Sequence, residues 1–215
     1  MSELNHAIVS FVEKTITGRM ANKLRSTRTN DVEILLDFVE EAGGGNHLEI
    51  GTLFGGSAIS VAIMKEILSH SGIVLCIDPL DGYYPQYAKR EDKKDSCGEL
   101  VVPEVLFKNI FNFGVSHRIA VMQTYSTDII ELPFEFSTAY IDGDHTHGVP
   151  ELDWNLVKDK VSHFVIFDNY DDLHPDVSKA CEVANNDPNW ICVYKDNMVY
   201  VVERINDENN CTCQN

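Results

Sequence analysis

The sequence predicts an α/β fold: a doubly wound, mostly parallel sheet of seven strands with a C-terminal antiparallel hairpin and an N-terminal helical addition. Two observations lead to this prediction. From residue 48 onward, short apolar runs alternate with segments of helical periodicity, as in consecutive βα units. The last two apolar runs follow one another across a turn at Asp196-Asn197, as in a hairpin. The parallel crossovers are expected to be right-handed.

Two amphipathic helices are expected before the first strand. Apolar residues recur at helical spacing over residues 5–17. A second helix can be capped by Asn30, with Glu33 completing a capping box, and the glycines at 43–45 end it. These helices pack on the sheet, cover a ligand site or form a dimer contact.

The strands are short apolar runs, several of them continuous, as expected for strands buried on both faces of a parallel sheet. They are predicted at residues 48–50, 73–77, 118–122, 136–141, 163–167, 190–194 and 198–202. Helices are predicted between them at residues 58–68, 101–113, 127–130, 150–160 and 175–185. The long polar stretch at residues 81–98 is expected to be either a mobile surface loop or a substrate lid.

Composition bounds the class of protein. A chain of 215 residues, 44% of them hydrophobic, fits one domain over residues 1–205, of which 1–43 form the N-terminal helices. The polar tail at 206–215 is expected to be disordered. A net charge of -17 argues against a duplex nucleic-acid partner and against an anionic membrane surface. Because no segment has the pattern of a secretory signal peptide or of a membrane-spanning helix, we expect a cytoplasmic protein.

The six cysteines are scattered and form no C-x-x-C pair. Cys76 and Cys192 lie in apolar runs and are interpreted as small buried hydrophobic residues. Cys211 and Cys213 lie in the polar tail, where two thiolates can bind a soft metal but are too few for a closed zinc site.

A glycine-rich turn follows the first predicted strand. Glu49 is followed by Gly51, Gly55 and Gly56, and an apolar helical pattern begins after Ser57. A strand that turns tightly into a helix has this pattern, and it offers backbone N–H groups to an anionic ligand. The spacing differs from the dinucleotide fingerprint G-x-G-x-x-G. By itself the turn is as consistent with a structural role as with a ligand cradle.

Four predicted strands end at or beside a carboxylate: Glu49, Asp78, Asp142 and Asp168. Ligands of doubly wound sheets bind outside the carboxyl ends of the strands, so these acids are expected to converge on one crevice. Asp78, after the second strand, is well placed to accept hydrogen bonds from both hydroxyls of a ribose. A glycine turn followed by a ribose-binding acid indicates a nucleoside-containing cofactor.

Hard oxygen donors follow the fourth and fifth strands. Asp142, Asp168 and Asn169 suit Mg²⁺ or another divalent cation, although each could instead stabilise a turn. His145 lies three residues after Asp142, and a histidine can take a proton from a hydroxyl near neutral pH.

Taken together, the glycine turn and the strand-end polar residues form one ordered pattern. Its members are Glu49, Gly51, Gly55, Ser57, Asp78, Asp142, Asp168 and Asn169. The pattern resembles class I S-adenosylmethionine-dependent methyltransferases, which have a Rossmann-like fold. Within them it is similar to the metal-dependent O-methyltransferases of the catechol and caffeoyl-coenzyme A type, and the run 142–145 also resembles the macrocin and sugar O-methyltransferase branch. The resemblance covers roughly residues 30–203.

The resemblance implies a role for each position. The methionine part of the cofactor would lie beside Glu49, Gly51, Gly55 and Ser57, its ribose beside Asp78, and its adenine beside Thr124, Tyr125 and Ser126. The Mg²⁺ ligands would be Asp142, Asp168 and Asn169. His145 stands where the catechol enzymes have a catalytic lysine, and Asp142 or Asp144 is the rival base because the sugar branch uses an aspartate.

The implied activity is methyl transfer to a hydroxyl of a small molecule, a sugar or a vicinal diol. Two alternatives stay open: a metal-independent methyltransferase acting on another acceptor, and a non-catalytic nucleoside-binding protein with the same fold. Basic pairs at residues 89–90 and 93–94 hint at an anionic acceptor, and the N-terminal helices could form a homodimer.

Overall fold

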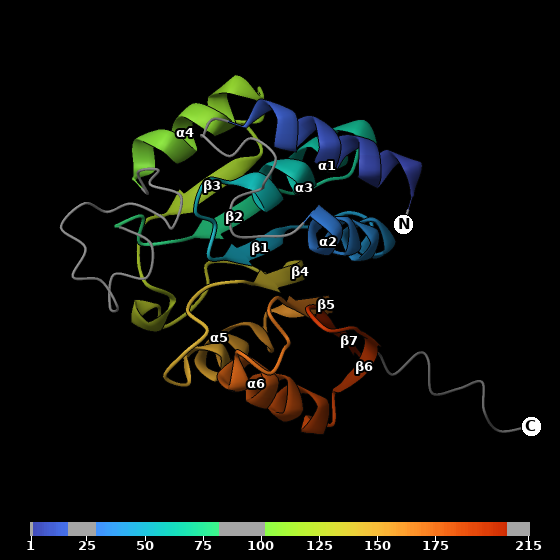
Figure 1. The fold of residues 1–215 in the computed structure, drawn as a ribbon, viewed down its shortest axis with the longest axis vertical. Coiled ribbons are helices and arrows are strands. Elements are labelled where there is room, and N and C mark those ends of the chain that lie inside the picture. The colour runs from blue at the N-terminus through green and yellow to red at the C-terminus, as the bar shows by residue number, and fades with distance from the viewer. Residues whose placement is uncertain (1, 17–28, 82–101, 206–215) are drawn as a thin grey trace, which may run out of the picture.

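The computed structural model describes residues 2–16, 29–81 and 102–205. In these residues the chain forms one seven-stranded sheet in the order β3-β2-β1-β4-β5-β7-β6 (Figure 1). The pairs from β3 to β5 are parallel, and β7 runs antiparallel to both β5 and β6. The predicted α/β fold class, including the C-terminal antiparallel hairpin, is confirmed.

The strands are β1 His47–Ile50, β2 Val74–Ile77, β3 Ile119–Met122, β4 Phe136–Ile141, β5 Val161–Phe167, β6 Trp190–Lys195 and β7 Tyr200–Arg204. The helices are α1 Glu3–Thr15, α2 Thr29–Ala42, α3 Gly56–Ile67, α4 Pro103–Asn112, the 3₁₀ turn η2 Ser126–Asp128, α5 Val149–Val157 and α6 Pro175–Asn186. No helix in the described ranges has the length and apolar character that a membrane span requires.

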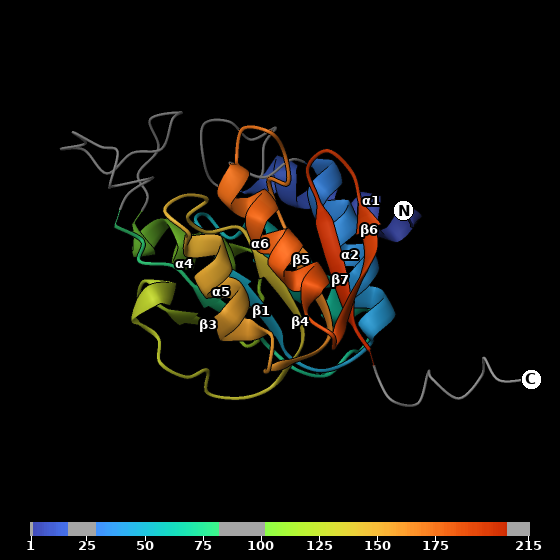
Figure 2. The same cartoon turned by 90° about the horizontal axis from the view of Figure 1, so that it is seen from below.

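The helices cover the two faces of the sheet. The core of one face joins side chains of α1, α2, α3 and α4, and the core of the other joins those of α5 and α6. Figure 2 shows α5 and α6 on one side of the strands, with α1 and α2 on the other. Because successive strand side chains point to opposite faces, Val74 and Cys76 of β2 enter the first core, and Leu75 and Ile77 enter the second. A strand covered on both faces is therefore apolar throughout.

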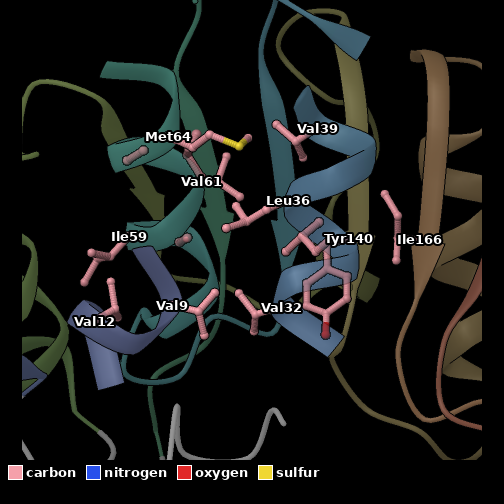
Figure 3. Close-up of a cluster of buried hydrophobic side chains, with 14 of the residues drawn as sticks. Val9, Val12, Val32, Leu36, Val39, Ile59, Val61, Met64, Tyr140 and Ile166 are labelled. Carbon is pink, nitrogen blue, oxygen red and sulfur yellow. The ribbon is translucent and has the colours of Figure 1, made fainter. Parts of the chain in front are cut away.

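The N-terminal helices are part of the first core. Val9 of α1, Leu36 of α2 and Val61 of α3 belong to one buried cluster with Tyr140 of β4 (Figure 3). The expected cap at Asn30 is wrong, because α2 already begins at Thr29. Instead of closing a capping box, Glu33 contacts α1, where its Oε1 lies 2.8 Å from His6 Nδ1.

The C-terminal hairpin turns at Asp196 as predicted, but its second strand begins two residues later than the sequence pattern predicts. The Asp196 carboxylate accepts hydrogen bonds from the N–H groups of Met198 and Val199, at 2.8 and 2.7 Å. These bonds hold Met198 and Val199 in the turn, so β7 begins at Tyr200. Most of the 81–98 loop and all of the 206–215 tail, with Cys211 and Cys213, lie outside the described residues.

Candidate active site

The carboxyl ends of four strands lie level with one another. Ile50 of β1 is in register with Ile77 of β2 on one side and with Ile141 of β4 on the other. Ile141 is in turn in register with Phe167 of β5. The residues that follow continue this pairing, because the N–H of Asp142 donates to Ile50 O at 2.9 Å. The strand-end acids Glu49, Asp78, Asp142 and Asp168 therefore meet at one edge of the sheet.

The glycine turn requires glycine at its first position. Gly51 has a φ of +90°, and a Cβ there would lie 2.0 Å from the carbonyl oxygen of Asp142. The turn thus packs its backbone directly against the end of β4. Gly55, with a φ of +86°, precedes the first turn of α3. Ser57 is buried in the first turn of α3. The glycine turn therefore places the N-terminus of α3, with its free N–H groups, at the same edge of the sheet.

Asp78 links the end of β2 to the glycine turn. Its Oδ2 accepts a hydrogen bond from the Leu53 N–H at 2.7 Å, and its Oδ1 accepts one from the Leu80 N–H at 2.8 Å. Burial raises the pKa of this carboxyl, and the backbone hydrogen bonds oppose the shift. Each oxygen keeps a lone pair that can accept a further hydrogen bond from a hydroxyl group.

Glu49 is fully buried beside the same turn. Burial raises its pKa to about 8, with smaller increases from Asp142 and Asp78. The Ser57 and Thr52 hydroxyls lie near enough to lower the pKa in part. However, no described residue makes a hydrogen bond of standard geometry to either Glu49 oxygen. A buried carboxylate without donors is costly, so this position suits a cationic or N–H-bearing group of a ligand.

Asp142 and Asp168 lie side by side. Burial raises the pKa of Asp168 well above its usual range, and the Asp142 carboxylate raises it further. Its Oδ1 has no hydrogen-bond partner among the described residues. The next residue, Asn169, has a φ of +60°. Two adjacent carboxylates, one of them buried and with an unsatisfied oxygen, fit a divalent cation, which would allow both to ionise.

A metal at this position would depend on few protein ligands. Among the described residues, no group of three or more His, Cys, Asp and Glu side chains could hold a metal ion. The candidate set instead contains two carboxylates and the Asn169 amide. Mg²⁺ is commonly bound by one or two carboxylates and keeps its other positions for water or substrate oxygens, so this set fits it.

His145 is buried next to this pair. Its Nε2 lies 3.4 Å from Asp142 Oδ1. Burial lowers the pKa of His145, and the surrounding acids, first Asp168 and then Asp144, oppose the shift. The neutral imidazole that burial favours can accept a proton. Asp144 is engaged locally, because its Oδ1 accepts hydrogen bonds from the N–H and hydroxyl of Thr146 at 3.0 and 2.6 Å.

The packing of the helices adds two residues that the sequence patterns did not single out. The His174 ring meets the His145 ring edge to face at 5.1 Å, and its Nδ1 lies 2.8 Å from Asp171 Oδ1. Asp31, in the first turn of α2, is buried, and its charge contributes to the raised pKa of Asp168. The three-residue spacing of Asp171 and His174 is the only sequence signal that could have predicted the contact between these two side chains.

The loop after β3 contacts the loop after β2. The Tyr125 hydroxyl donates to Asp81 Oδ2 at 2.6 Å, and Gln123 Nε2 donates to the carbonyl oxygen of Pro79 at 3.3 Å. Thr124 and Ser126 flank Tyr125, so all three predicted adenine neighbours lie next to the end of β2, where Asp78 stands.

No protein-family model and no curated protein matches the chain. Solved structures share its fold at low identity. The O-methyltransferase NovP superposes with a TM-score of 0.74 at 15% identity, covering 94% of this chain and 100% of that one. The O-methyltransferase TomG from Streptomyces achromogenes, in complex with S-adenosylmethionine, gives 0.62 at 15% identity, covering 96% and 92%.

A putative RNA methyltransferase from Pyrococcus horikoshii also shares the fold, with a TM-score of 0.61 at 12% identity, covering 96% of this chain and 98% of that one. The chain therefore has the Rossmann-like fold of the class I S-adenosylmethionine-dependent methyltransferases. Because the names of these neighbours range from O-methyltransferase to putative RNA methyltransferase, the shared fold leaves the acceptor open.

Proposed function

We propose that this chain is an S-adenosylmethionine-dependent O-methyltransferase that methylates a hydroxyl of a small molecule, a sugar or a vicinal diol, with the help of Mg²⁺ or another divalent cation. The observation that carries the proposal is the convergence of buried acids at one edge of the sheet. Glu49 and Asp78 flank the glycine turn, and Asp142 and Asp168 lie beside it. Glu49, Asp78 and Asp168 are buried, and carboxylates gathered in this way are costly unless a bound cation or hydrogen-bond donors compensate them.

Each part of S-adenosylmethionine has a complementary group here. The buried Glu49 carboxylate suits the ammonium of the methionine part, and the N–H groups at the start of α3 suit its carboxylate. Asp78 can accept hydrogen bonds from the two ribose hydroxyl groups. The adenine then extends toward Thr124, Tyr125 and Ser126. The same turn supplies Gly51 and Gly55, whose backbone allows the close approach that a ligand needs.

Asp142, Asp168 and Asn169 would hold the cation. A bound divalent cation lowers the pKa of a coordinated hydroxyl and orients it for attack. Asp142 and Asp168 would position that ion beside the methyl-donor site, and the burial of Asp168 would limit the access of water to it. Water exclusion strengthens the electrostatic interactions that the two carboxylates make.

The transfer itself requires little further from the chain. In that transfer the acceptor oxygen would form a bond to the methyl carbon while the carbon–sulfur bond breaks, and S-adenosylhomocysteine would be the leaving group. His145 takes the hydroxyl proton, because burial favours its neutral form. Asp142, whose Oδ1 lies 3.4 Å from His145 Nε2, can stabilise the imidazolium that results, or serve as the base itself.

The cofactor part is tested by calorimetry with S-adenosylhomocysteine. Binding supports the proposal, and no binding at millimolar concentration contradicts it. Methyl transfer is tested on a panel of catechols and sugars, followed by release of S-adenosylhomocysteine. Binding without transfer to any panel member favours the non-catalytic nucleoside-binding alternative.

The metal part is tested by EDTA and by substitution. We expect activity to be lost in EDTA, restored by Mg²⁺, and reduced at least 100-fold by Asp168→Asn, because one of two carboxylate ligands is removed. Asp172→Asn is the matched control, since Asp172 is an exposed carboxylate four residues away. Full activity in EDTA would support the metal-independent alternative.

Two further expectations about partners stay predictions. An anionic acceptor was inferred from basic pairs at residues 89–90 and 93–94, which lie outside the described residues. A homodimer would have an apolar surface available on α1 and α4, because Phe11 of α1 and Phe107 and Phe111 of α4 are exposed. Sedimentation of Phe111→Ser beside the wild type tests the dimer.

A further inference from the structure

Asn109 is a buried polar side chain on α4 for which the methyl transfer described above has no role. It is 0% exposed, and its Nδ2 donates a hydrogen bond to the carbonyl oxygen of Phe54 at 3.0 Å. Phe54 lies in the glycine turn, 55 residues earlier in the chain. Burying a carboxamide costs free energy unless hydrogen bonds inside the protein replace those to water. One such bond here goes to the backbone of the turn to which the proposed cofactor binds.

The glycine turn has a backbone that needs support from its surroundings. Gly51, Leu53 and Gly55 all have a positive φ, of +90°, +50° and +86°. A left-handed conformation is unfavourable for a leucine, and such conformations persist where the surrounding contacts fix them. The Leu53 N–H donates to Asp78 Oδ2 at 2.7 Å, and the carbonyl of the next residue accepts from Asn109. Two side chains from different elements therefore hold neighbouring residues of the turn.

The hydrogen bond from Asn109 fixes the peptide group that leads into α3. The C=O of this group, between Phe54 and Gly55, accepts from Asn109, and its N–H donates to the carbonyl oxygen of Thr52 at 2.8 Å. The first hydrogen bond of α3 then joins the Ile59 N–H to the Gly55 carbonyl oxygen at 2.8 Å. The N–H groups of the three residues between Gly55 and Ile59 have no partner within the helix. Their direction follows from the orientation of the peptide group before them.

Apolar side chains of α4 pack against the same two residues of the turn. Phe54 is 1% exposed and belongs to a small apolar cluster, separate from the two main cores, against which Val105 of α4 packs. A Cβ on Gly55 would lie 2.6 Å from Leu106 Cδ1, so α4 lies directly against the turn. Apolar packing has no preferred direction, whereas a hydrogen bond does. The contact from Asn109 is therefore the one that orients the Phe54 carbonyl.

We propose that Asn109 is a positioning residue of the cofactor site. Through the Phe54 carbonyl it fixes the glycine turn and the first N–H groups of α3 in the orientation that receives the amino-acid part of S-adenosylmethionine. Without the Asn109 donor this carbonyl is buried and unsatisfied, so the peptide group turns toward another donor and the N–H groups after it move. The ribose depends less on this peptide group, because Asp78 holds it from the end of β2. The inference rests on the proposed function, because it assumes the same cofactor.

The test compares, by calorimetry, the affinities of S-adenosylhomocysteine and of 5′-methylthioadenosine, which has the same nucleoside but no amino-acid part. The ratio of the two dissociation constants measures how much the amino-acid part contributes to binding. Asn109→Leu has a similar branched side chain without a donor. We expect it to bind S-adenosylhomocysteine about tenfold more weakly and to change the affinity for 5′-methylthioadenosine by less than about twofold. Asn112→Leu is the matched control, since Asn112 is exposed on the same helix, and it should keep both wild-type affinities.

Asn109→Ala provides the second variant, in case Asn109→Leu does not fold. It also removes the donor and should lower the contribution of the amino-acid part. A merely structural role of Asn109 would lower stability but leave the ratio unchanged in the folded protein, so an unchanged ratio in either folded variant overturns the inference and leaves the proposed cofactor in place. A wild type that binds both compounds equally also overturns it, because the amino-acid part then has no contact for Asn109 to position. No binding of S-adenosylhomocysteine by the wild type overturns both proposals.

Discussion

Replacing Gly51 by alanine tests how the glycine turn and the end of β4 depend on each other. A Cβ at this position would lie 2.0 Å from the Asp142 carbonyl oxygen and 2.7 Å from the Gly143 Cα, and neither backbone atom can rotate away. The left-handed φ of +90° costs roughly 1–2 kcal/mol for a non-glycine residue. Separating the packed strand ends costs roughly 1–3 kcal/mol more. We expect Gly51→Ala to lose about 2–5 kcal/mol of unfolding free energy.

The matched control is Gly43→Ala. Gly43 has a φ of +73°, but no described atom lies within 4 Å of its Cβ position, so only the conformational cost applies. Urea unfolding followed by circular dichroism gives both free energies. A difference of about 1–3 kcal/mol between the two variants is expected from the clash alone. Equal losses would refute the claim that the turn packs against β4.

Three further predictions concern buried side chains. The folded-state pKa of Glu49 is about 8, whereas its unfolded value is 4.5. Glu49 therefore loses its proton more easily in the unfolded chain, and it lowers the unfolding free energy increasingly as the pH rises between these two values. The largest loss is about 5 kcal/mol. Glu49→Gln cannot titrate and should gain stability over the wild type between pH 5 and pH 8.5 in urea unfolding; parallel pH curves would contradict this. The Tyr140 hydroxyl is buried without a described hydrogen-bond partner, so Tyr140→Phe should raise the unfolding free energy by about 1 kcal/mol, and a loss would count against it. Leu36→Ala should cost about 2–5 kcal/mol in thermal unfolding, whereas Leu173→Ala, at a position 83% exposed, should change it by less than about 0.5 kcal/mol.

The order of strands and helices could be predicted because periodicity is local. The alternation of β2 side chains between two cores makes it continuously apolar, and the strand could be recognised without its neighbours. The acids at the strand ends were also predictable. Parallel strands end at one edge, so Asp78, Asp142 and Asp168 had to meet there once the strands were assigned.

Local signals failed where a tertiary contact competed with them. Glu33 has the spacing of a capping box with Asn30, yet it contacts His6 of α1 instead. The apolar run of the second hairpin strand includes Met198, but the Met198 N–H donates a hydrogen bond to the Asp196 side chain, and Met198 therefore lies in the turn. In both cases a side chain formed a contact that the sequence pattern does not specify.

The sequence by itself determined the βα order, the glycine turn and the acids at the strand ends, because each depends on residues close together along the chain. Only the tertiary structure decided which helix residues join them. Asp31, Asn109 and His174 come from α2, α4 and the start of α6, and the way those helices pack on the sheet brings them to the site. Helix packing depends on side-chain fit across the whole core, which no local spacing records.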